Sequence, residues 1–343
     1  MHAVVLAGGY GGARFARGLR DFLAEQGKSD ADEITVIANV ADDIRLHGLH
    51  ISPDLDTIMY TLGDGLDEER GWGRRDESFS AAQEFAAYGA VSWFGLGDRD
   101  LATHVIRTQM REGGYSLTEV TAALCQRWQP GVTLLPATDD RLETHVVVQV
   151  DSPSSGAGVA AVTSAGADKA IHFQEWWIRY RADVPTKSFV LVGAEQARPT
   201  PAVLAALRNA DVVFLAPSNP IVSVDPILKV PGMRTALLAA SAPIIGISPL
   251  IGGKPLRGMA DKCLAVAEIE PSAAGIAHYY GRRGEGGVLD GWLVDSQDSD
   301  LVPQIQADGM PAAAVPSVMH NKEASMTLAR EALTFADSPA VRS

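Results

Sequence analysis

Two pairs of aspartates lie close together near the start of the chain. Asp42 and Asp43 occur in IANVADDIRLHG, and Asp54 and Asp56 follow a Ser-Pro turn in HISPDLDT. Carboxylates at this spacing repel one another unless water, hydrogen bonds or a cation separates them. Mg²⁺ prefers such hard oxygen ligands, so a socket for this ion is one interpretation of the set.

The same aspartates also have purely local interpretations. Asp54 could cap the helix that starts near Leu55, and Asp56 could favour the positive N-terminal end of that helix. Asp42 and Asp43 could be solvated loop residues. Because all four lie beside a glycine-rich turn and near a predicted strand end, we favour a metal site for the set.

The glycine-rich turn is AGGYGGAR, which lies between a short apolar run and a helical pattern. Such a turn brings backbone N–H groups close to phosphate oxygens. Gly9 and Gly11 match the first two glycines of the dinucleotide fingerprint, but Arg14 occupies the third position, and the Walker ending Gly-Lys-Ser/Thr is missing. We predict a phosphate cradle from Gly9 to Gly12 with added charge from Arg14; a structural tight turn is the alternative.

Three later stretches carry further polar candidates. In FGLGDRDLATH, Asp98 begins a predicted helix, and Asp100 and His104 are four residues apart, so their side chains can meet on one helix face. A helix cap with a surface ion pair is the alternative there. In APSNP, Ser218 and Asn219 lie between two prolines, where a hydroxyl and an amide could bind a base or a phosphate.

The third stretch, SPLIGGKPLRG, places Gly252 and Gly253 before two basic residues. Alone, it is more typical of a loop than of a binding site. A second glycine-rich, basic turn at a second strand end nevertheless favours an anionic ligand.

The elements that must position these residues alternate along the chain. Apolar runs such as AVVLA, EITVIAN and DVVFLA are separated by helical patterns, and DSPSSGAG, near residue 154, is typical of a loop. The alternation predicts an α/β fold with a doubly wound, mainly parallel Rossmann-like sheet and helical insertions. Ligands of such sheets bind at the carboxyl ends of strands, where the candidates gather, including Asn39 after the second strand.

We expect a single α/β domain over residues 1–343. Its core strands are predicted within 1–45 and 185–300, with a largely helical insert at about 55–130. A closing helix is predicted at about 321–336.

Composition narrows the classes of partner. The 343 residues are 46% hydrophobic and 21% charged, as in ordinary folded proteins, and the net charge of −13 argues against nucleic acid as the main partner. No apolar run approaches the roughly 18 residues of a membrane span, and the glycines follow the N-terminus too soon for a signal peptide. Cys125 and Cys263 form no CxxC pair, so a reduced cytoplasm is the expected compartment.

Several blocks occur together in a characteristic order. HISPDLDT, LGDRDLATH and PSNP form the most specific combination among them. Over roughly residues 3–295 the chain resembles the 2-phospho-L-lactate transferase family, the CofD/FbiA-like enzymes of coenzyme F-420 biosynthesis. The residues in these blocks are most similar to those of the actinobacterial phosphoenolpyruvyl transferase branch.

The resemblance implies a Mg²⁺-dependent transfer between two small molecules. The ribityl hydroxyl of 7,8-didemethyl-8-hydroxy-5-deazariboflavin would attack a guanosine diphospho donor that carries 2-phospholactate or its enolpyruvyl counterpart, and GMP would leave. The residues do not decide between lactyl and enolpyruvyl. Relatives also imply a homodimer.

The resemblance also suggests roles for particular residues. Asp54 is the first choice to contact the deazaflavin or the metal, and Asp54 and Asp43 are the catalytic candidates. Many relatives carry a basic residue where this chain has Gly95. If that residue contacts substrate in them, Trp93 or a basic side chain from elsewhere must substitute here. The candidate metal ligands are Asp42, Asp43, Asp54 and Asp56. The candidate substrate-binding residues are Gly9, Gly11, Gly12, Arg14, Asn39, Asp54, Trp93, Gly95, Asp98, Ser218, Asn219, Gly252 and Gly253.

Three other functions fit parts of the sequence. A nicotinamide-dependent dehydrogenase would need a third glycine and an acidic residue at the second strand end, where Asn39 stands. A sugar-nucleotide-type transferase would differ in its acceptor hydroxyl. A non-catalytic guanine-nucleotide or deazaflavin binding protein on the same fold stays open as the main alternative.

Overall fold

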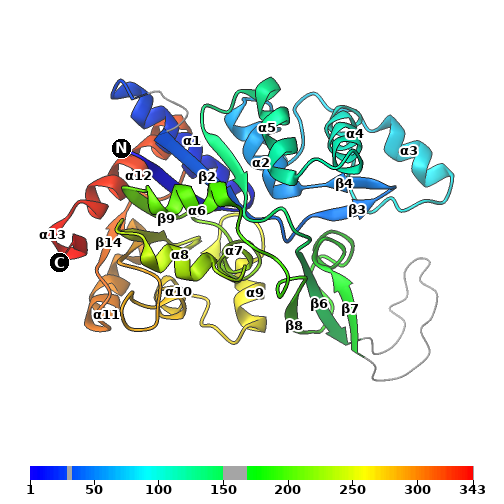
Figure 1. Ribbon diagram of the computed structural model, residues 1–343. Helices are drawn as coiled ribbons and strands as arrows, with labels where there is room; N and C mark the ends of the chain where they lie inside the picture. The colour runs from blue at the N-terminus through cyan, green and yellow to red at the C-terminus, as the bar shows by residue number, and fades with distance from the viewer. Residues whose placement is uncertain (29–32, 150–167, 343) are drawn as a thin grey trace.

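The computed structural model describes residues 1–28, 33–149 and 168–342 (Figure 1). The predicted loop DSPSSGAG lies outside these residues. Within them, no helix is long and apolar enough to cross a membrane.

A seven-stranded sheet forms the centre of the molecule, in the order β14-β13-β10-β9-β1-β2-β5. Every pairing within it is parallel. β1, β2, β9, β10 and β13 are buried along their whole length, as expected for continuous apolar runs covered on both faces. The predicted doubly wound parallel sheet is therefore confirmed. The strands are β1 (Ala3–Ala7), β2 (Ile34–Ala38), β5 (Thr133–Pro136), β9 (Val212–Leu215), β10 (Ile244–Ile247), β13 (Gly291–Asp295) and β14 (Ala312–Val315).

The strand order reverses at β1. The chain builds outward on one side through β2 and β5, and then returns to pair β9 with the other edge of β1. The carboxyl end of β1 is therefore a topological switch point, where open α/β sheets bind their ligands.

The predicted ranges for the core strands differ from the sheet at three places. β5 and β14 belong to the sheet but lie outside 1–45 and 185–300. β8 lies within the predicted range but pairs antiparallel with β6 in a separate sheet of order β7-β6-β8. Burial alternates along β6, which is the pattern of a one-sided sheet rather than of a core strand. The small sheet comprises β6 (Glu143–Gln149), β7 (Asp168–His172) and β8 (Thr186–Val192).

Helices flank the central sheet. α1 packs against α2 and α12, and α6 packs against α8 (Figure 1). The helical insert was predicted at about 55–130 and contains α2 to α5, and the closing helix predicted at about 321–336 is α12. The helices are α1 (Gly9–Glu25), α2 (Pro53–Leu62), α3 (Ser80–Ala87), α4 (Asp98–Glu112), α5 (Leu117–Trp128), α6 (Pro201–Arg208), α7 (Asp225–Leu228), α8 (Met233–Ala239), α9 (Ala260–Val266), α10 (Ala273–Tyr280), α11 (Val302–Ala307), α12 (Lys322–Ala336) and α13 (Pro339–Arg342).

Candidate active site

A cavity of about 620 Å³ opens at the switch point of the sheet. The loops that follow β1, β9, β10 and β14 all contribute to its lining, together with the first turn of α2. Because the carboxyl ends of parallel strands meet at one edge, residues from distant parts of the sequence converge here.

A hairpin brings the two aspartate pairs together. β3 (Ile44–Leu46) and β4 (Leu49–Ile51) pair antiparallel, so the chain leaves at Asp43 and returns at Ser52. The Ser52 hydroxyl donates to Asp43 Oδ2 at 2.7 Å. The carboxylates before and after the hairpin therefore share one region of the protein.

Asp54 lies in the first turn of α2 but does not cap that helix. Ser52 is the N-cap residue, without a capping side-chain bond, and the Asp54 carboxylate accepts from Asn39 Nδ2 at 2.8 Å. It also lies so close to the β1–α1 turn that a Cβ on Gly8 would be 2.5 Å from its Oδ2. Burial raises the pKa of Asp54 to about 6, against the opposing bonds from Asn39 and the Gly9 backbone. The side chain thus joins β1, β2 and α2 at the cavity, which it lines.

The neighbouring carboxylates of Asp42 and Asp43 are also largely buried away from solvent. Burial, reinforced by the charge of Asp54, raises the pKa of Asp42 well above its usual range, and burial does the same to Asp43. Asp42 Oδ1, Asp43 Oδ1 and Asp56 Oδ2 are buried and have no hydrogen-bond partner among the described residues. A buried carboxylate oxygen without a partner is costly, and a hard divalent ion beside it would offset that cost. The alternative in which Asp42 is a solvated loop residue is wrong, because it is only 3% exposed.

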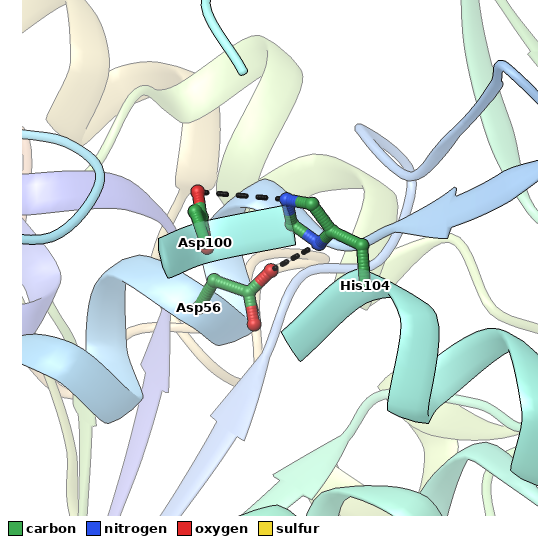
Figure 2. Close-up of side chains that lie close together, drawn as sticks. All are labelled: Asp56, Asp100 and His104. Atoms are coloured by element: carbon green, nitrogen blue, oxygen red, sulfur yellow. Dashed lines mark ion pairs between the residues drawn. The ribbon is translucent and has the colours of Figure 1, made fainter. Parts of the chain in front are cut away.

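Asp56 belongs to a second, adjacent network on α2 and α4. Its Oδ1 accepts from the buried guanidinium of Arg107, and its Oδ2 lies 3.7 Å from Nδ1 of His104. His104 Nε2 lies 3.5 Å from Asp100 Oδ2, so the imidazole stands between two carboxylates (Figure 2). Tyr60 donates to Asp100 Oδ1 at 2.6 Å.

The second network confirms that Asp100 and His104 meet on one helix face, but the pair is buried rather than on the surface. Asp56, Asp100 and His104 lie close enough together to share a metal ion. Arg107 already places a positive charge on Asp56, which disfavours a cation beside this carboxylate. Among the described residues, however, no group of three that includes Asp42, Asp43 or Asp54 brings its ligand atoms as close together. The sequence interpretation missed Arg107, although it lies one helical turn after His104.

The glycine turn packs tightly against the loop after β9. A Cβ on Gly11 would overlap the carbonyl oxygen of Pro217, and one on Gly12 would lie 2.6 Å from Ser218 Oγ. Ser218 accepts from the Gly8 N–H at 3.1 Å and donates to the Gly8 carbonyl at 2.8 Å. Gly9 and Gly11 line the cavity, so the turn combines the structural role with the position expected of a phosphate cradle.

Three other predicted binding residues line the cavity and also contact neighbouring residues of the protein. Asn219 lines the cavity, and its side chain caps the turn that follows by accepting from the N–H of Ile221 at 3.0 Å. Arg14 lines the cavity, and its Nη2 lies 3.7 Å from Glu68 Oε2. Gly95 also lines it, and a Cβ there would be 2.6 Å from the Trp72 ring.

Two predicted binding residues lie directly behind the cavity lining formed by the described residues. Asn39 supports the lining carboxylate of Asp54 through its side-chain amide. Gly12 packs against Ser218, which also lines the cavity. Both therefore hold lining residues in place rather than facing the cavity themselves.

Four other predicted substrate-binding residues lie outside the cavity lining formed by the described part of the chain. Asp98 caps α3 by accepting from the N–H of Ala81 at 2.9 Å, and this exposed cap lowers the pKa of its carboxyl to about 2. Gly252 donates its N–H to Asp298 Oδ1 at 3.0 Å. The contacts of Asp98, Trp93, Gly252 and Gly253 with substrate stay predictions, without support from the cavity geometry.

Fold and site together define a Rossmann-like α/β protein whose switch point opens into an acidic cavity that suits a metal ion and a phosphorylated ligand. The family model described as 2-phospho-L-lactate transferase CofD matches residues 3–331. The chain belongs to this family, as the resemblance predicted.

Curated relatives match over nearly the whole chain. The chain is 54% identical over 338 residues to a protein named phosphoenolpyruvate transferase from Streptomyces coelicolor, covering 98% of each chain. It is 51% identical over 340 residues to one of the same name from Mycolicibacterium smegmatis, covering 98% of this chain and 99% of that one. A crystal structure of a UPF0052 family protein from Bacillus halodurans is 17% identical, with a TM-score of 0.59 over 97% of this chain and 98% of that one, and supports the fold.

Proposed function

We propose that this protein transfers a phosphoenolpyruvyl group from enolpyruvyl-diphospho-5'-guanosine to the ribityl hydroxyl of 7,8-didemethyl-8-hydroxy-5-deazariboflavin, releasing GMP, in coenzyme F-420 biosynthesis. The observation that carries the proposal is the match above half identity, over almost the whole chain, to proteins named phosphoenolpyruvate transferase. The relatives' names favour the enolpyruvyl donor over its 2-phospho-L-lactyl counterpart, which stays the alternative donor.

The carboxylates beside the switch point would hold Mg²⁺. Asp42, Asp54 and Asp56 line the cavity, and Asp43 contributes a further buried oxygen without a partner among the described residues. Held there, Mg²⁺ would supply charge neutralisation for the diphosphate and for the leaving GMP.

The protein's own groups would align the donor. The backbone N–H groups of Gly9 to Gly12 begin α1, and the N-terminus of a helix attracts phosphate. Arg14 and Arg257 add positive charge to the cavity lining. Phosphoryl transfer asks mainly for such alignment and charge neutralisation.

We assign the proton of the attacking hydroxyl to Asp54. As the hydroxyl oxygen bonds to the phosphorus farther from guanosine, the bond from that phosphorus to GMP breaks and the hydroxyl proton passes to the carboxylate. In the metal-free protein the pKa of this carboxyl is about 6, which suits a general base near neutral pH, and Asp42 and Asp43 can hold the ion while Asp54 takes the proton. Asp43, the other catalytic candidate, is not among the cavity-lining residues. We further infer a homodimer from the family resemblance, and a cytoplasmic location from the two cysteines that form no CxxC pair.

The test is a turnover assay with purified protein, the deazaflavin, MgCl₂ and each guanosine donor, in which mass spectrometry follows GMP and the product. Product is expected with the enolpyruvyl donor, and its loss is expected with EDTA and in Asp54→Asn. Asp183→Asn is the matched control, because Asp183 is exposed and pairs with Lys262. Deazaflavin binding without GMP from either donor would instead indicate a non-catalytic binding protein.

A further inference from the structure

The mouth of the cavity differs in chemistry from its acidic floor. Trp72, Trp177, Ile178 and Leu256 line the cavity, and each is still 37% to 63% exposed. Large apolar side chains that stay exposed around a cavity are typical of a surface that a ligand covers. The mouth therefore suits an apolar part of a substrate, while the floor suits its charged part.

These side chains come from three segments of the chain that contact one another beside the cavity. The Trp72 ring packs on Gly95, and Gly71 lies against the guanidinium of Arg257, which follows Leu256. Gly258 in turn lies beside the Trp177 ring, where a Cβ would be 3.8 Å from Cη2. The positive φ angles of Gly71 and Gly258, 76° and 83°, allow these close turns.

The segment that carries Trp72, residues 67–75, is tied down across the N-terminal part of α1. We call it the 67–75 strap. Glu68 accepts from Tyr10 Oη at 2.7 Å and from Arg17 Nη1 at 2.6 Å. Arg257 donates to the carbonyl oxygens of Glu68 and Glu69 at 3.4 and 3.3 Å. These contacts hold the strap, and the indole itself lies between Gly95 and the guanidinium of Arg70, which is 5.3 Å from the ring centroid. Part of the indole surface stays exposed at the cavity.

Gly95 leaves the space that this indole occupies. A Cβ at position 95 would be 2.6 Å from Cη2 of Trp72, which is too close for the ring to keep its place. Trp72 can therefore occupy this place at the cavity wall only because residue 95 has no side chain. An aromatic wall occupies the position where the family resemblance suggests a basic contact.

We propose that Trp72 is a binding residue for the planar ring system of the acceptor, which packs against the indole at the cavity mouth. The inference rests on the proposed function and specifies which part of the acceptor this chain contacts there. A planar, poorly hydrated ring gains from contact with an indole, whereas the charged donor belongs with the carboxylates, the helix N-terminus and Arg14. The ribityl chain then extends from the mouth toward the floor.

Calorimetric titration tests this with the deazaflavin alone in MgCl₂, and separately with GDP as a probe of the donor side. Trp72→Ala is expected to weaken deazaflavin binding by roughly 5- to 150-fold, the range of stacking on an aromatic side chain, and to leave GDP binding within about twofold of wild type. Trp72→Phe is expected to restore most of the affinity. Tyr88→Ala is the matched control, because Tyr88 is 86% exposed and lies outside the cavity lining.

The inference would be overturned by unchanged deazaflavin affinity in Trp72→Ala. An equal loss of deazaflavin and GDP affinity would indicate a purely structural role and would overturn it too. Absence of deazaflavin binding to the wild type would overturn it as well. If the wild type binds deazaflavin through Trp72 but releases no GMP, the proposed transfer fails and this inference stands.

Discussion

The guanidinium of Arg107 and the carboxylate of Asp56 form a buried ion pair that joins α4 to the first turn of α2. The two side chains are only 2% and 6% exposed. Burial raises the pKa of Asp56, and the charge of Arg107 opposes that rise. The pair therefore keeps one oxygen of Asp56 occupied, while the other has no hydrogen-bond partner among the described residues.

Arg107→Met should lower the free energy of unfolding by about 3–5 kcal/mol, because it leaves a buried carboxylate without its counter-charge. Arg107→Lys should lose less, since it keeps the charge. Urea denaturation in EDTA would measure both. Arg330→Met is the control: Arg330 pairs with Glu331 at the surface, and about 0–1 kcal/mol is expected there. Equal, small losses in both methionine variants would contradict the importance of the buried pair.

Asp54→Asn should stabilise the metal-free protein at pH 8. The folded-state pKa of Asp54 is about 6, above the usual 3.8, so the folded protein holds this proton more tightly than the unfolded chain does. The buried charge therefore costs stability above pH 6, by up to about 3 kcal/mol, and the cost disappears as the pH falls toward 4.

The measurement is the difference in unfolding free energy between Asp54→Asn and wild type from pH 4 to pH 8 in EDTA. The advantage of the variant should shrink with falling pH. Asp183→Asn, at an exposed ion pair, should stay within about 0.5 kcal/mol of wild type throughout. A difference that does not vary with pH would argue against a raised pKa for Asp54.

Mg²⁺ should stabilise the folded protein through the carboxylates beside β1. A ligand at 100 times its Kd adds about 2.7 kcal/mol to the free energy of unfolding, so the melting temperature should rise with MgCl₂ and fall back with EDTA. Asp42→Asn should abolish most of this rise, because Asp42 Oδ1 is buried without a partner among the described residues. Thermal melts at constant ionic strength, with NaCl as the control salt, would measure it. An undiminished response in Asp42→Asn would place the ion elsewhere.

Glu68→Gln should loosen the 67–75 strap with little effect on global stability. The Glu68 side chain is 44% exposed, so the loss of its ion pair with Arg17 should cost less than about 1 kcal/mol. Deazaflavin affinity should nevertheless fall, because Trp72 is no longer held at the cavity mouth. Calorimetric titration would measure the affinity, and the tryptophan fluorescence spectrum would report the changed surroundings of the indole. Glu331→Gln, at a surface pair, should change neither. If Glu68→Gln behaves in the same way, Glu68 does not position Trp72.

Much of the local structure could be predicted from the sequence. The alternation of apolar runs with helical patterns was enough for β1, α1, α2 and α12, because periodicity and turn residues are local properties. The partner of a strand is not local: β8 was expected among the core strands, and the structure pairs it with β6 in the small sheet. Its apolar residues could fit either position, and only the packing of distant segments selects one.

The candidate site also has one part that the sequence predicted and another that only the tertiary structure shows. The carboxylates from Asp42 to Asp56 could be grouped from the sequence, because they lie within fifteen residues of one another, near a glycine turn and a predicted strand end. The structure adds the hairpin that connects the two pairs. The pairing of Asp56 with Arg107, and the meeting of Trp72 with Trp177 around one cavity, could not be predicted. These residues are contributed by separate elements, and burial against the sheet and the loops, rather than any spacing along the chain, decides which side chains face one another.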